Sequence, residues 1–82
     1  YFFRSHAGME IDLLVDRGSR RIGCEFKAGA SLGPDDWKWL KAGIELDVIQ
    51  EGLLVHGGEH SFPIAKEIRA VPALDLLRKG IP

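Results

Sequence analysis

Residues 9–16 and 21–27 both alternate between apolar and polar side chains, which is typical of β-strands that bury one face. The apolar positions are Ile11, Leu13 and Val15 in the first stretch, and Ile22, Cys24 and Phe26 in the second. Leu14 is the exception, because it falls among the polar positions. Residues 17–20 read Arg-Gly-Ser-Arg and interrupt the alternation with turn-forming residues. The pattern predicts a β-hairpin with one solvated face.

Helical spacing and turn residues organise the rest of the chain. Further strands are predicted at residues 1–4, 52–56 and 61–64, with Gly-Gly-Glu-His at 57–60 as a hairpin turn. Helices are predicted at residues 34–47, and from Pro72 to just before Gly80. This order predicts a single α/β (or α+β) domain over residues 1–82, in which helices flank a mixed β-sheet.

The register of the predicted hairpin decides which polar side chains meet. Two registers match apolar to apolar positions: a two-residue loop sets Asp16 opposite Ser19, and a four-residue loop sets Asp16 opposite Arg21. We prefer the four-residue loop, because it leaves Gly18 inside the turn and faces unlike charges across the strands. This register places Asp12 opposite Glu25, and Glu10 opposite Lys27.

In either register Asp12 and Glu25 lie close enough to bind one divalent cation together, since directly opposite Cβ atoms are roughly 4.5–5.5 Å apart. Two carboxylates, a main-chain oxygen and water molecules suit Mg²⁺. Lys27 shares a strand face with Glu25, where it would orient or deprotonate a water molecule or stabilise charge on a phosphate. The alternative is a solvated sheet face with ion pairs worth only about 0–1 kcal/mol. The residues alone leave both interpretations open.

An acid on one strand and an acid-x-Lys triplet on the next resemble the PD-(D/E)XK nuclease superfamily, whose fold is restriction-endonuclease-like. Asp12 matches the first position, and Glu25-Phe26-Lys27 matches the triplet. The predicted helix and strand that follow also fit the core of that fold. The resemblance implies that Asp12 and Glu25 hold Mg²⁺ (or Mn²⁺). It also implies that Lys27 and Glu10 serve catalysis on DNA.

Nearly the whole chain is more closely similar to the C-terminal domain of a family of bacterial and archaeal AAA-type ATPases. The similarity rests on "FFRSHAGMEIDLLV" and "IGCEFKAGASL", and on the later "VHGGEHSF" and "IRAVPALDLL". It implies an AAA-type ATPase domain in the same chain, so residues 1–82 are expected to be a fragment of a longer protein. There are two departures from the superfamily pattern. No proline precedes Asp12, and the N-terminal helix of the core is missing before Tyr1.

Charge and composition narrow the choice of partners. Eleven Lys and Arg against twelve Asp and Glu give a net charge of -1, so no global basic field points to DNA. Contact with DNA would need a local patch, and the candidates are Arg4, Arg17, Arg20 and Arg21. The alternative for the three arginines of residues 17–21 is a charged turn that keeps the hairpin soluble. One cysteine excludes an intrachain disulfide, and no apolar run approaches the ~20 residues of a membrane span, so we expect a cytoplasmic protein.

Two further functions remain open alongside nuclease activity. The domain could be a non-catalytic module that docks DNA or another protein for its ATPase. It could also be a structural homodimerisation domain, with Trp39 as a contact residue. The chain has no GxxxxGK[ST] motif, so it does not itself bind ATP through a P-loop.

Overall fold

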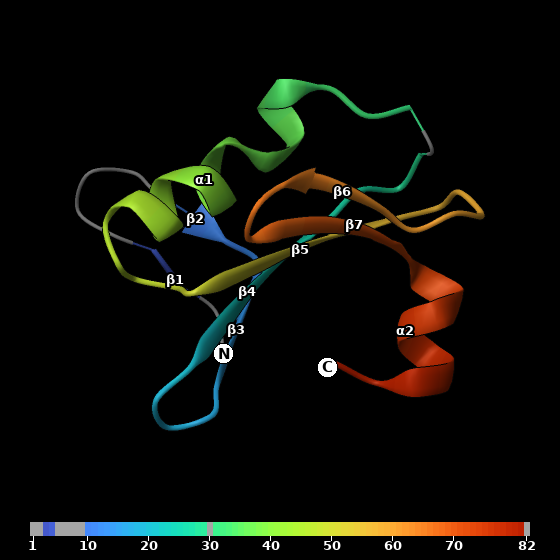
Figure 1. The fold of residues 1–82 in the computed structure, drawn as a ribbon. Coiled ribbons are helices and arrows are strands. Elements are labelled where there is room, and N and C mark those ends of the chain that lie inside the picture. The colour runs from blue at the N-terminus through green and yellow to red at the C-terminus, as the bar shows by residue number, and fades with distance from the viewer. Residues whose placement is uncertain (1–2, 5–9, 30, 82) are drawn as a thin grey trace.

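A five-stranded mixed sheet and a separate two-stranded sheet form the centre of the computed structural model, which describes residues 3–4, 10–29 and 31–81 (Figure 1). The strands are β1 (Phe3–Arg4), β2 (Glu10–Ile11), β3 (Leu13–Asp16), β4 (Arg21–Phe26), β5 (Glu51–His56), β6 (Phe62–Ala65) and β7 (Ile68–Pro72). The helices are the 3₁₀ helix η1 (Pro34–Trp37), α1 (Lys38–Glu45) and α2 (Ala73–Lys79). No helix within these described residues is long and apolar enough to cross a membrane.

The order of strands in the larger sheet is β3-β4-β5-β7-β6. β3 and β4 are antiparallel, β5 and β7 continue the sheet parallel to β4, and β6 is antiparallel to β7. Between β4 and β5 the chain crosses over through η1 and α1, as parallel neighbours require (Figure 1). The predicted mixed sheet with flanking helices is therefore confirmed.

The preferred hairpin register is also confirmed, because Asp16 lies opposite Arg21 and Leu13 lies opposite Cys24. The loop between them includes Gly18, whose φ of 81° lies in the region that favours glycine. Matching of apolar faces and the chemistry of one turn were enough to choose between the two registers.

The predicted strand at residues 9–16 is wrong in one respect, because it is interrupted at Asp12. The bend shifts the alternation, so that Ile11 and Leu14 point to the same side of the sheet although they are three residues apart. Leu14, which the pattern placed among the polar positions, is 1% exposed. Leu13 and Val15 pack on the opposite side. Burial of a Leu side chain stabilises the folded state by about 1.5–3 kcal/mol. Packing Leu14 under α1 therefore favours the bend over a regular strand.

The prediction of a hairpin between residues 52–56 and 61–64 is wrong. β5 pairs in parallel with β7, a strand that the sequence pattern did not predict. β6 pairs with β7 across the turn at Lys66 and Glu67, and among the described strands it has no other partner. Residues 57–61 therefore carry the chain past β7 to the edge of the sheet (Figure 1). Ile68 and Ala70 are buried, while Arg69 between them is exposed. This alternation of apolar and polar side chains is typical of a strand.

Two apolar layers hold the sheet between the helices. The layer on the α1 side is made of Ile11, Leu14, Leu40, Ile49, Leu54 and Ile68. The layer on the other side is made of Ile22, Cys24 and Leu53, and Leu53 also lines an open pocket together with α2. Close packing under α1 requires Gly43, since a Cβ there would lie 3.1 Å from Ile49 Cγ1. Trp39 is partly buried against the α1-side layer, so it is not the exposed contact residue that the sequence suggested.

The closing helix is confirmed as α2. Pro72 precedes it, Arg78 and Lys79 lie in its last turn, and Gly80 follows with a φ of 76°. The predicted helix at residues 34–47 begins as η1 and continues as the shorter α1, with Asp35 and Asp36 in the first turn.

Candidate metal centre at the carboxyl end of β4

The candidate residues gather where β4 ends and the chain turns toward η1. Glu25 is the penultimate residue of β4 and Lys27 follows the strand directly. Asp12 lies at the bend between β2 and β3, and its Oδ2 accepts a hydrogen bond of 3.0 Å from the backbone N–H of Phe26. The antiparallel ladder itself ends at Leu13 and Cys24, so this bond extends the contact of the two chain segments beyond the ladder. The bend therefore keeps Asp12 beside Glu25, as the register predicted.

Glu25 lies on the α1 side of the sheet, at a position opposite Leu54 of β5. Its carboxyl is half-buried, and its Oε1 atom is buried without a hydrogen-bond partner among the described residues. Burial is the main reason that its pKa rises to about 8; the negative charge of Asp12, a hydrogen bond with that side chain and the charge of Glu10 add to the effect. A cation bound at this point would offset the repulsion between these carboxylates.

Glu10 does not lie opposite Lys27, contrary to the preferred register extended to this end of the hairpin. Because the strand bends at Asp12, Glu10 pairs instead with Arg4 in the two-stranded sheet of β1 and β2. Glu10 still acts on the centre, since its charge contributes to the raised pKa of Glu25. The side chain of Arg4 lies outside the described residues.

Lys27 is held by Asp36, a residue that the sequence pattern did not assign to the site. Its Nζ donates to Asp36 Oδ1 at 2.9 Å, and its backbone N–H donates to Val55 O at 2.8 Å. Within the described part of the chain no ion pair joins Lys27 to Asp12 or Glu25. The signal for Asp36 was its place in the first helical turn after a loop, which by itself predicted only a favourable helix start.

The donor set contains few protein ligands. Over residues 3–4, 10–29 and 31–81, no three or more His, Cys, Asp or Glu side chains are grouped so that they could hold a metal ion. Asp12 and Glu25 supply two carboxylates, which fits Mg²⁺, because this ion keeps several water molecules and takes one or two carboxylates from a protein. His56 offers no ligand, because its Nδ1 accepts from Gly58 N–H at 2.9 Å and its Nε2 lies 3.1 Å from His60 O.

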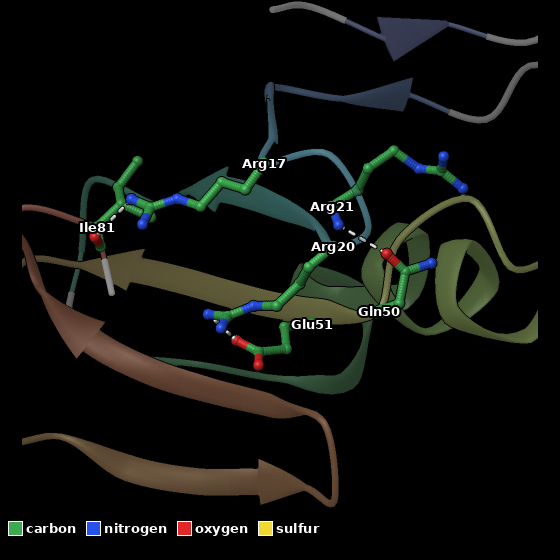
Figure 2. A network of polar contacts seen from close by, with 6 residues as sticks. All are labelled: Arg17, Arg20, Arg21, Gln50, Glu51 and Ile81. Atoms are coloured by element: carbon green, nitrogen blue, oxygen red, sulfur yellow. Dashed lines mark hydrogen bonds and ion pairs between the residues drawn. The ribbon is translucent and has the colours of Figure 1, made fainter.

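The three arginines of residues 17–21 lie at the opposite end of the hairpin, where the chain itself binds them (Figure 2). Arg17 Nη2 donates to Ile81 O at 2.8 Å, and Arg20 Nη2 forms an ion pair of 3.1 Å with Glu51. Arg21 donates its Nε to Val48 O, and its Nη2 to Asp47 O at 2.9 Å. Its backbone N–H donates to Gln50 Oε1 at 2.6 Å. These contacts give the arginines a structural role in joining the hairpin to β5 and to the end of the chain.

The fold and the candidate site thus define this protein as a mixed α/β domain with a pair of carboxylates at the end of a strand. The chain belongs to the family described as "Domain of unknown function (DUF4143)", whose model matches residues 1–76. It is 29% identical over 80 residues to "Uncharacterized protein Mb2031c" of Mycobacterium bovis and to "Uncharacterized protein Rv2008c" of Mycobacterium tuberculosis. Each match covers 98% of this chain but only 18% of the relative. No solved structure matches the chain.

Proposed function

We propose that this domain hydrolyses phosphodiester bonds in DNA, with Mg²⁺ (or Mn²⁺) held by Asp12 and Glu25. The observation that carries the proposal is the state of Glu25. A buried, unpartnered Oε1 atom beside a second carboxylate is unfavourable in the chain by itself, and the raised pKa of about 8 expresses that cost. Binding of a cation between Asp12 and Glu25 would favour the ionised form of Glu25 and offset that cost.

The fold supports the resemblance to the PD-(D/E)XK nucleases. An antiparallel strand pair, a helical crossover and a parallel strand are the elements that this resemblance implies, and β3, β4, α1 and β5 follow that order. A restriction-endonuclease-like core is therefore our proposal for the finer description of the fold. The proposed parent is an AAA-type ATPase in the same chain, in the cytoplasm, and relatives more than five times longer leave room for such a domain.

Each residue of the centre has a distinct role in the proposed reaction. When bound, the metal supplies a Lewis acid for a phosphodiester oxygen and a more acidic water molecule. Asp12 and Glu25 bind it with their carboxylates, and Glu10 strengthens cation binding through its negative charge. Lys27 contributes an ammonium group that stabilises charge developing on the phosphate.

Cleavage of plasmid DNA by the full-length protein, with Mn²⁺ or Mg²⁺ titrated into the reaction, tests the proposal. We expect metal-dependent nicking that Asp12→Asn, Glu25→Gln and Lys27→Met each reduce at least about 100-fold, as when groups of one active site are removed. Glu59→Gln, which makes the same change on an exposed loop residue, is the matched control and should cleave normally. Wild-type protein that neither binds metal in calorimetry nor nicks DNA would contradict the proposal.

A non-catalytic docking module is the second candidate, and the small donor set favours it. Among the described residues, no group of three His, Cys, Asp or Glu side chains could hold a metal ion, and Lys27 is paired with Asp36. In that case DNA or protein binding would survive Glu25→Gln, with no metal uptake and no cleavage. The third candidate, a homodimerisation domain, predicts instead a dimer in sedimentation and no binding of DNA.

A further inference from the structure

The ion pair between Lys27 and Asp36 joins the candidate centre to the start of the crossover. Lys27 stands two residues after Glu25 and therefore shares its side of the strand, toward η1 and α1. Its Nζ donates to Asp36 Oδ1 at 2.9 Å, and both side chains are partly shielded, with 36% and 20% of their surfaces exposed. In the proposed reaction, the ammonium group of Lys27 lies near the phosphate and stabilises its developing charge.

Asp36 is itself fixed by the chain around it. Its Oδ2 accepts the backbone N–H of Gly33 at 2.7 Å, and its own N–H donates to Gly33 O at 2.9 Å. Pro34 between them limits the backbone at the start of η1. Hydrogen bonding to Lys27, and then to Gly33, holds the pKa of Asp36 below its usual range, so that it is a charged anchor at neutral pH.

An anchored carboxylate changes what a lysine can do. Lysine has a long flexible stem, and holding its ammonium in one place costs rotamer entropy. The ion pair with Asp36 orders the Lys27 side chain in the folded protein before any substrate binds. Ordering a catalytic group before substrate binding lowers the activation barrier. An ordinary structural ion pair would join β4 to η1 equally well, so the two roles differ only in their effect on the reaction.

We infer that Asp36 is a positioning residue, which holds the ammonium of Lys27 at the end of β4 so that it meets the phosphate of a bound DNA strand. The inference rests on the proposed function. It assigns a role to a helical residue outside the Asp and Glu-x-Lys pattern, and it makes the start of η1 part of the active centre.

Asp36→Asn in the full-length protein tests the inference, because an asparagine oxygen still accepts from Gly33 while the charge facing Lys27 is lost. In the metal-free protein we expect reductive methylation of Lys27, followed by mass spectrometry, to be several-fold faster, with Lys38 and Lys41 unchanged. In the cleavage assay we expect kcat to fall about 10- to 100-fold with KM for DNA and affinity for Mn²⁺ unchanged. Asp36→Glu should restore part of kcat, and Asp35→Asn, a change at the exposed neighbour, should have no effect.

Four outcomes would overturn the inference, and they are distinguishable. A normal kcat in Asp36→Asn would remove the positioning role and leave the proposed function intact. Unchanged methylation of Lys27 would show that Asp36 does not hold it in solution. Absence of cleavage by wild-type protein would remove the proposed function, and the positioning role with it. A fall in kcat that tracks a lower melting temperature, with no rescue by Asp36→Glu, would assign the ion pair to stability alone.

Discussion

The two ends of the β3–β4 hairpin carry similar numbers of charged side chains but treat them in opposite ways. At the turn, Arg17 is bound by the carbonyl of Ile81 and Arg20 by the carboxylate of Glu51 (Figure 2). The guanidinium of Arg21 is bound by backbone carbonyls of Asp47 and Val48. At the open end, acids cluster, and the charges of Asp12 and Glu10 add to the burial that raises the pKa of Glu25. Charges whose bonds the fold itself completes contribute to stability. Like charges that the fold brings together cost stability unless a proton or a cation neutralises them.

The strongest test of this contrast lies at the turn. Arg21→Ala removes side-chain hydrogen bonds to Val48 O and Asp47 O in the connection between α1 and β5. We expect the free energy of unfolding to fall by about 2–3 kcal/mol, because bonds from a charged donor are lost and the carbonyls lose their partner. Urea denaturation measures the change, and the exposed Arg69→Ala is the control. A loss below about 0.5 kcal/mol would break the contrast at this end.

A pH titration of stability sharpens the contrast at the open end. The pKa of Glu25 is about 8 in the folded chain, against 4.5 as its ordinary value. Between these pH values the folded state binds more protons than the unfolded state, so the metal-free protein loses stability as the pH rises. Because Glu25 is only half-buried, solvent screening reduces this loss to about 1–2 kcal/mol. Urea denaturation in the presence of a chelator, from pH 4.5 to 8.5, measures it.

Glu25→Gln is the matched variant for this titration, since it keeps the shape of the side chain and cannot ionise. We expect this change to remove most of the pH dependence and to make the metal-free protein more stable than wild type at pH 8. Saturating Mg²⁺ should flatten the wild-type profile alone, because a bound cation favours the ionised carboxylate. A wild-type profile that already coincides with that of Glu25→Gln would show that the open end is not under electrostatic strain.

The smallest expected effect concerns the ion pair between Arg20 and Glu51. Their side chains are 42% and 41% exposed, so water and salt screen the attraction. A double-mutant cycle with alanine at both positions should give a coupling free energy below about 1 kcal/mol, and less at high salt. A larger, salt-resistant coupling would mean that the turn is held by this pair and not mainly by Arg21.

The proximity of the two acids was more predictable than the fold around them. The register set by apolar matching and one turn placed Asp12 near Glu25, although the bend at Asp12 breaks the alternation there. The partner of Lys27 was not predictable in the same way, because Asp36 reaches it only after the chain has turned back into η1. The pairing of Glu10 with Arg4 was missed because it depends on the bend at Asp12.

The sequence by itself determined the hairpin, its register and the proximity of two acids, since each follows from contacts between residues near one another in the chain. Only the tertiary structure decided that Leu14 is buried under α1, that β7 lies beside β5, and that Asp36 binds Lys27. These outcomes depend on which distant surfaces are available for burial and pairing. Where an apolar side chain gains more from a helix packed above it than from regular alternation, the backbone bends, and at Asp12 that bend shapes the candidate centre.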